Sequence, residues 1–99
     1  MQFDLYRNEE ENADFFPYVL DVTNELHHLS KLRGVIPLCS DGAAVTHLNP
    51  TFTIEGRKLY LSTMDIAGVP AGMLQERVAN LADRRNEIVD AVDFLIHGF

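Results

Sequence analysis

Residues 85–99 read "RNEIVDAVDFLIHGF" and carry the clearest structural signal of the chain. Their apolar members recur at the i, i+3, i+4, i+7 spacing that gives a helix one apolar face: Ile88, Ala91, Val92, Phe94 and Leu95. Asp83 or Asn80 is expected to cap the start, and Gly98 is the glycine that commonly follows a helix end. The sequence therefore predicts one C-terminal helix within residues 75–96.

Short extended stretches precede this helix and show the alternation or compact apolar runs of strands: residues 2–6, 15–22, 33–39 and 51–63. Phe3 and Leu5 are expected to share a buried face. Pro17 lacks the backbone N–H of a ladder, so it is expected at a strand edge or strand start. Glu55-Gly56 lies between two alternating runs and predicts a hairpin turn.

The connecting segments have weaker signals. Residues 23–32, "TNELHHLSKL", are expected to form a loop with some helical content, and residues 64–74 to be extended or irregular. A turn is expected at Asp41-Gly42. The fold class is therefore mainly β with one C-terminal helix, in a single domain spanning residues 1–99.

Composition excludes several classes of function. Of the 99 residues, 46% are hydrophobic, and 15 acids against 8 bases give a net charge of −7. An acidic chain is a poor direct ligand for nucleic acid, whose phosphates are bound by cations. No apolar run approaches the roughly 18 residues of a membrane span, and the start "MQFDLY" lacks a secretion signal, so a cytoplasmic protein is expected.

The polar residues form no recognisable catalytic motif. His27 and His28 are adjacent and therefore point in different directions, which disfavours a metal site. Cys39 lies in an apolar run, where cysteine usually behaves as a small buried hydrophobe. Because no nucleophile elbow, phosphate loop or dinucleotide fingerprint is present either, we expect neither an enzyme nor a cofactor.

Five segments together resemble the CcdB toxin family of toxin–antitoxin modules. They occur in the family's order and cover nearly the whole chain: "MQFDLY" (1–6), "DV" (21–22), "VIPL" (35–38), "MDIAGVP" (64–70) and "RNEIVDAVDFLIHGF" (85–99). The resemblance implies a homodimer of small SH3-like β-barrels, each with a C-terminal helix.

The same resemblance implies a function that needs no catalysis. Family members poison DNA gyrase: they bind the gyrase A subunit and trap the enzyme on cleaved DNA. A CcdA antitoxin neutralises them, and the toxin–antitoxin complex represses its own operon, as in plasmid maintenance modules. DNA contact would then come from gyrase or from the antitoxin.

The family's gyrase-contacting tail is Trp-Gly-Ile, which falls on His97, Gly98 and Phe99. The resemblance also implies roles for four further positions: Asp93, Leu95 and Ile96 would be secondary gyrase contacts or dimer-interface residues, and Leu26 would support the gyrase contact. Gly98 matches the family, whereas His97 replaces a tryptophan with a smaller ring that has less surface for stacking. Two alternatives follow: Phe99 has become the main aromatic anchor, or the protein has weak toxicity and mainly binds antitoxin as a corepressor.

The residues that bind the antitoxin cannot be transferred from the family in this way. The loop "RNEEENADFF" at residues 7–16 departs from the family pattern. We expect this charged loop to influence the choice of partner.

Overall fold

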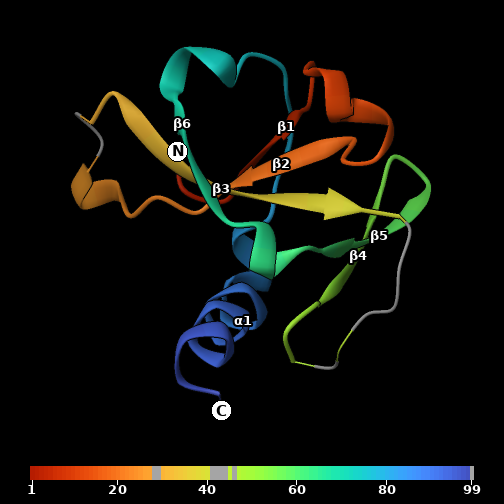
Figure 1. Ribbon diagram of the computed structural model, residues 1–99, viewed down its shortest axis with the longest axis vertical. Coiled ribbons are helices and arrows are strands. Elements are labelled where there is room, and N and C mark those ends of the chain that lie inside the picture. The colour runs from red at the N-terminus through yellow and green to blue at the C-terminus, as the bar shows by residue number, and fades with distance from the viewer. Residues whose placement is uncertain (28–29, 41–44, 46, 99) are drawn as a thin grey trace.

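An antiparallel sheet forms most of the structure, and one helix packs at its end (Figure 1). The computed structural model describes residues 1–27, 30–40, 45 and 47–98. Within them lie seven strands and one α-helix: β1 (Asp4–Arg7), β2 (Tyr18–Asp21), β3 (Leu32–Cys39), β4 (Thr51–Ile54), β5 (Arg57–Leu61), β6 (Ala67–Pro70), β7 (Arg77–Asn80) and α1 (Arg85–His97). Short 3₁₀ turns join them: η1 (Glu11–Asp14), η2 (Glu25–His27), η3 (Thr63–Asp65), η4 (Ala71–Met73) and η5 (Ala82–Arg84).

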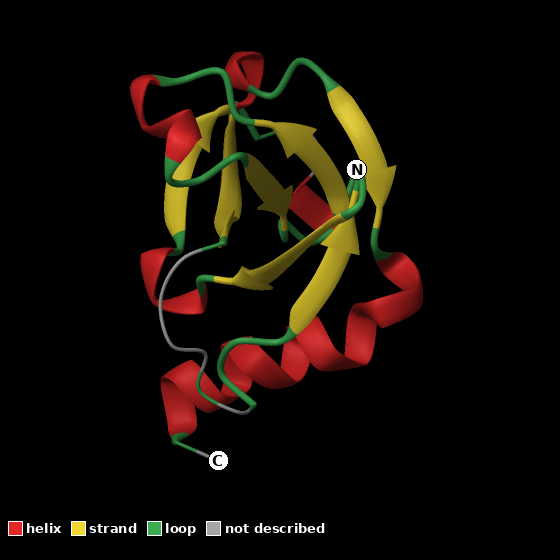
Figure 2. Ribbon diagram, turned by 90° about the vertical axis from the view of Figure 1, so that its right-hand side faces the viewer, coloured by secondary structure: helices red, strands yellow, loops and turns green. Residues whose placement is uncertain are grey.

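Strand β3 organises the sheet, whose order is β4-β5-β3-β2-β1-β7. One edge of β3 pairs with β2, in the register Leu38 opposite Tyr18. Its other edge is divided, because β6 pairs with the first half of β3 and β5 with the last two residues. The sheet therefore curls into a half-barrel, which confirms the mainly β class with one C-terminal helix (Figure 2).

The predicted hairpin is confirmed as β4 and β5. Glu55 and Gly56 form its turn, and their φ angles of 49° and 79° lie in the left-handed region that a two-residue hairpin loop uses. Phe52 and Leu59 face each other across the hairpin, and both are buried. The alternation of hydrophobic residues and the residue types of the turn thus both favour a hairpin at this position.

The first two predicted strands are confirmed with small changes at their starts. Phe3 has a φ of 68°, outside the extended region, so β1 begins at Asp4, although Phe3 and Leu5 are both buried as expected. Pro17 immediately precedes β2, where its missing N–H disturbs no ladder bond. Cys39 ends β3 with its side chain buried.

The first part of residues 75–96 contains a strand that the sequence did not predict. Residues 77–80 form β7, which pairs with β1, and α1 begins only at Arg85, after η5. The four-residue strand is too short to show a period of its own, and the pairing partner that fixes it lies more than 70 positions earlier.

The expected cap of α1 also differs from the structure. Asp83 lies within η5, and no side chain caps α1 at its N-cap position, Arg84. The Asn80 side chain instead accepts a hydrogen bond from the backbone N–H of Ala82, at 2.9 Å, and so stabilises the 3₁₀ turn.

The core lies between the curled sheet and α1. Ile88 and Ala91 are the buried residues of α1, and Ile88 packs into the main apolar cluster with strand residues such as Leu5 and Leu61. At the start of α1, Arg84 pairs with Glu87 and lies 4.4 Å above the ring of Phe52. An ion pair between residues three positions apart, Arg84 and Glu87, therefore marks the start of α1.

Two further connections match their predictions. The 3₁₀ turn η2 gives residues 23–32 the expected helical content, and η3, β6 and η4 make up residues 64–74. The turn expected at Asp41-Gly42 lies outside the described residues. No helix in the described part of the chain is long and apolar enough to cross a membrane.

A buried ion pair joins β2 to β3. Nε of Arg33 donates to Oδ2 of Asp21 at 2.9 Å, and Nη2 lies 2.8 Å from the same oxygen, although without good hydrogen-bond geometry. Asp21 is 1% exposed and Arg33 8% exposed, and the second oxygen of Asp21 accepts from the N–H of Thr23. Both charges have lost most of their water, and Asp21 is the counter-ion of Arg33, while the N-terminal ammonium of Met1 also lies 3.8 Å from Oδ2 of Asp21.

We expect Asp21→Asn to lower the free energy of unfolding by about 3 kcal/mol, because it leaves the Arg33 charge buried without a counter-ion. Urea unfolding at pH 7 measures this loss. Asp90→Asn, at an exposed helix position, is the control and should change the value by less than about 0.5 kcal/mol. The double variant Asp21→Val with Arg33→Met should recover most of the loss, and equal damage in single and double variants would contradict the argument.

Candidate functional site

The predicted tail follows the last turn of α1. Gly98 has a φ of 78° and donates its N–H to the carbonyl of Phe94 at 2.8 Å, which is the left-handed glycine cap expected from the sequence. A β-carbon at Gly98 would meet no atom within 4 Å, so only the backbone angle requires glycine there. The cap ends the helix.

The residues of the helix end differ in exposure. Ile96 is 67% exposed, and Asp93, His97 and Gly98 are also exposed. Leu95 is half-buried, which fits its place on the face of α1 that packs toward the protein. Phe99 lies outside the described residues. The end of α1 therefore presents one large apolar side chain, Ile96, beside polar neighbours.

Leu26 is not brought to this end of the molecule. It lies in η2 and is 86% exposed, while Figure 1 shows η2 well separated from the C-terminal end of α1. Within one chain, the residues predicted to contact gyrase therefore lie on two separate surfaces.

A contact not foreseen from the sequence lies next to the tail. The ring of His47 meets the ring of Phe94 edge to face, with centroids 6.4 Å apart. His47 adopts a φ of 73°, an uncommon angle outside glycine. It connects the segment before β4 to the turn of α1 whose carbonyl receives the Gly98 cap.

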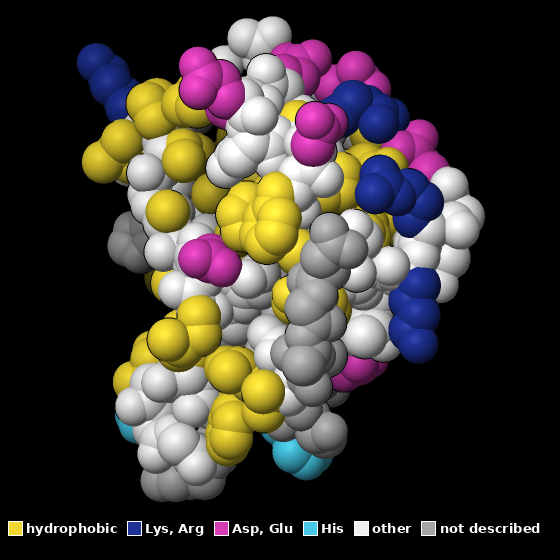
Figure 3. All heavy atoms as spheres, turned by 45° about the vertical axis from the view of Figure 1, so that its right-hand side comes forward, with side chains coloured by type: hydrophobic (Ala, Val, Ile, Leu, Met, Phe, Trp, Pro, Cys, Tyr) yellow, Lys and Arg dark blue, Asp and Glu magenta, His cyan; other side chains and the backbone are white. Residues whose placement is uncertain are grey.

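Exposed apolar side chains occur on α1, on the neighbouring η3 and at the residue that follows η3. Met64 and Ile66 are 68% and 42% exposed, and Val89 on α1 is 37% exposed. Figure 3 shows hydrophobic side chains on the surface at the end of the molecule that holds α1 and in further groups near its middle and upper left, with most of the visible Lys and Arg at the right-hand edge. Large exposed aliphatic side chains on two elements that contact each other are typical of a contact surface.

Among the described residues, no group of three or more His, Cys, Asp or Glu side chains is arranged to hold a metal ion. His28 and the side chain of His27 lie outside the description.

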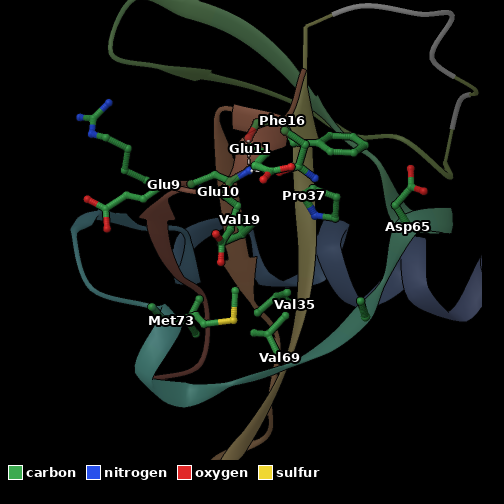
Figure 4. Close-up of a pocket in the computed structure, with 15 residues that line it drawn as sticks. Glu9, Glu10, Glu11, Phe16, Val19, Val35, Pro37, Asp65, Val69 and Met73 are labelled. Carbon is green, nitrogen blue, oxygen red and sulfur yellow. Dashed lines mark hydrogen bonds between the residues drawn. The ribbon is translucent and has the colours of Figure 1, made fainter. Parts of the chain in front are cut away.

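A second surface feature is a groove of about 640 Å³ on the other side of the sheet from the core. Its sides are η1 with the preceding loop, and the segment from η3 to η4. Figure 4 shows Glu9, Glu10 and Glu11 on one side and Asp65 on the opposite side, with Pro37 between them and Val19 below the glutamates. The charged loop singled out in the sequence thus forms one wall of this groove.

A network of charges supports the groove where β1 ends. Arg7 donates from Nε to Glu76 at 2.8 Å and from Nη2 to Glu55 at 3.0 Å. The hydroxyl of Tyr18 also donates to Glu55. This hydrogen bond, together with Arg7, keeps the pKa of Glu55 below its usual value, while burial and the Glu55 carboxylate raise the pKa of Tyr18. The arrangement holds the β4–β5 turn against β1.

A half-barrel with a C-terminal helix, whose end and flank expose apolar side chains, defines a small β protein built to present contact surfaces. Residues 2–98 match the family described as CcdB protein. The chain therefore belongs to the CcdB family, which confirms the resemblance found in the sequence. The family consists of toxins of toxin–antitoxin modules that act on gyrase.

Gly98→Ala should destabilise the protein by about 1 kcal/mol, because alanine is strained at a φ of 78°. Urea unfolding measures the change. Gly72→Ala is a matched control, since Gly72 also leaves open space for a β-carbon but has no positive φ. If both substitutions changed the free energy of unfolding equally, the left-handed conformation of Gly98 would have no effect on stability.

The hydrogen bonds of Glu55 should make the free energy of unfolding depend on pH. Since the folded pKa lies below the usual 4.5, the ionised form stabilises the folded state above that pH, and this contribution is lost as the pH falls through the folded pKa. The difference in unfolding free energy between the wild type and Glu55→Gln should be largest at pH 7 and shrink below pH 4.5. A difference that stays constant from pH 7 to 3 would contradict this assignment.

Proposed function

We propose that this protein inhibits gyrase by binding the gyrase A subunit and holding gyrase on cleaved DNA. The observation that carries the proposal is the end of α1, where a left-handed glycine cap follows an exposed Ile96 and His97. Family membership supplies the target class. The contact set comprises the predicted tail and its neighbours: Asp93, Leu95, Ile96, His97, Gly98 and Phe99.

The mechanism we propose is a shift of population between states of gyrase. A protein that binds one conformation of an enzyme much more tightly than the others holds the enzyme there, without chemistry of its own. A shift from 1:99 to 99:1 needs about a 10⁴-fold difference in affinity. The proposal therefore requires that the tail discriminate between gyrase conformations, and it requires no catalytic residue or cofactor.

The charge of the protein fits indirect action on DNA. With a net charge of −7, it offers phosphates little attraction, so the DNA contact is assigned to gyrase or to the antitoxin. The place of action is the cytoplasm, where gyrase acts on the chromosome.

We assign the exposed apolar surface of α1 and η3 to a homodimer contact. Met64, Ile66 and Val89 lie on adjacent elements, and a second copy of the chain would remove them from water. A two-fold arrangement would present two tails. It would also allow Leu26 of each chain to contribute a contact away from its own tail.

The further partners in the proposal are those of the family. A CcdA-like antitoxin neutralises the toxin, and the complex of the two represses its operon. A second candidate function is a family member of weak toxicity that serves mainly as antitoxin partner and corepressor. The observation that favours it is His97, which offers a smaller ring than the family's tryptophan at the helix end.

Removing residues 97–99 should abolish growth inhibition when the protein is expressed in a gyrase-sensitive bacterium. Loss of an interface anchor commonly costs about 2 kcal/mol or more, so binding to the gyrase A subunit should fall by about 30-fold or more. Asp90→Asn, on α1 but away from the tail, should leave toxicity unchanged. Undiminished toxicity of the truncated protein would exclude the tail as the gyrase contact.

His97→Trp separates the two candidate functions. If the wild type is weakly toxic because the imidazole is too small, the substitution should raise growth inhibition and tighten gyrase binding, while the affinity for antitoxin stays the same. If Phe99 already serves as the main anchor, Phe99→Ala should abolish toxicity and His97→Trp should add little. A wild type that inhibits growth strongly, with relief by a substitution in the gyrase A subunit, would exclude the corepressor alternative.

A further inference from the structure

The groove beside η1 has an apolar floor. Val19 on β2 and Val35 and Pro37 on β3 point out of the sheet on the side opposite the core. Val69 and Met73 face them from β6 and η4, and Figure 4 shows these side chains close together beneath the acidic wall. Met73 is 42% exposed and Val69 is half-buried, so a partner can still remove apolar surface from water here.

The rim of the groove is acidic. Glu9, Glu10 and Glu11 lie on one wall, and Asp65 lies on the other. Among the described lining residues Arg7 is the cation, and both Glu55 and Glu76 already neutralise it. The carboxylates of the three glutamates form no ion pair with any described residue, so their charge is available to a partner.

Hydrogen bonds hold the acidic wall in place. Nδ2 of Asn8 donates to the carbonyl of Phe16 at 2.7 Å and to Oδ1 of Asn12 at 2.8 Å, which closes the loop across its base. Oδ1 of Asn8 accepts from the backbone N–H of Glu10 at 3.0 Å. The glutamates therefore stand on an ordered turn, and a partner need not organise their backbone in order to bind.

We propose that this groove docks a peptide segment of another protein that carries aliphatic side chains flanked by lysine or arginine. The aliphatic side chains would lie on Val19, Val69 and Met73, and the cations would meet the glutamates and Asp65. A volume of about 640 Å³ is within the range of sites that enclose several side chains. The proposal concerns a second surface and stands whether or not the tail binds gyrase.

Charge complementarity decides the chemistry of the occupant. An acidic segment would meet like charge on both sides of the floor, in a protein that already carries a net charge of −7. A nucleic acid is excluded for the same reason. A wholly apolar segment would leave the rim carboxylates next to it without counter-ions, whereas a cationic amphipathic segment satisfies both the rim and the floor.

The test uses two synthetic peptides with the full-length protein: six residues of alternating lysine and valine, and six of alternating glutamate and valine. The lysine peptide should bind at least tenfold more tightly at low ionic strength, and it should shift the backbone amide NMR signals of Val19 and Val69. No preference between the peptides, or signal shifts confined to α1, would overturn the proposal.

Matched variants separate the groove from overall charge. Glu10→Gln with Glu11→Gln should weaken the lysine peptide about fivefold to tenfold, while Asp83→Asn with Asp90→Asn removes the same charge elsewhere and should change binding less than twofold. The double variant Glu10→Lys with Glu11→Lys should bind the glutamate peptide more tightly than the lysine peptide. If the two charge-neutralising double variants weakened binding equally, the effect would come from the net charge of the protein, and the proposed groove would be contradicted. Growth inhibition by the Glu10→Gln and Glu11→Gln protein should stay at the wild-type level, so this result and that of the tail truncation are independent.

Discussion

Strand β3 imposes the constraint on which the rest of the structure depends, because it must be covered on both faces. Ile36 and Leu38 point into the core, and Val35 and Pro37 point to the opposite side. Three neighbours share its two edges, so β3 cannot lie in a flat sheet: β6 and β5 leave the same edge in different directions. The half-barrel, the core and the groove all follow from this one strand.

The helix depends on the same arrangement. Ile88 and Ala91 fill the open end of the curled sheet, and this anchors the first half of α1. The later residues pack progressively less, so that Ile96 is largely exposed. The proposed gyrase contact is thus the exposed end of a helix whose orientation is fixed by buried residues about one to two turns earlier.

Much of this could be predicted from the sequence, and the exceptions share a physical cause. Local patterns identified the β4–β5 hairpin, the glycine cap at Gly98 and the burial of Phe3 and Leu5, because each depends on neighbouring residues. Strand β7 was missed because the strand it pairs with, β1, is at the other end of the chain. The groove could not be foreseen for the same reason, since its floor and walls come from segments that only the curled sheet brings together. The family resemblance named the tail residues, yet Leu26 lies apart from them within one chain.

The anchoring of the acidic loop by Asn8 has a consequence for how such a protein changes over generations. None of the residues of η1 is buried, and the turn is closed by the amide of Asn8 and by backbone groups rather than by the glutamates themselves. Charges at positions 9–11 can therefore be exchanged or reversed with little effect on folding. Recognition at this groove can diverge from one lineage to the next while the barrel, the helix and the tail stay under separate selection, and related modules in one cell can thereby avoid binding each other's partners.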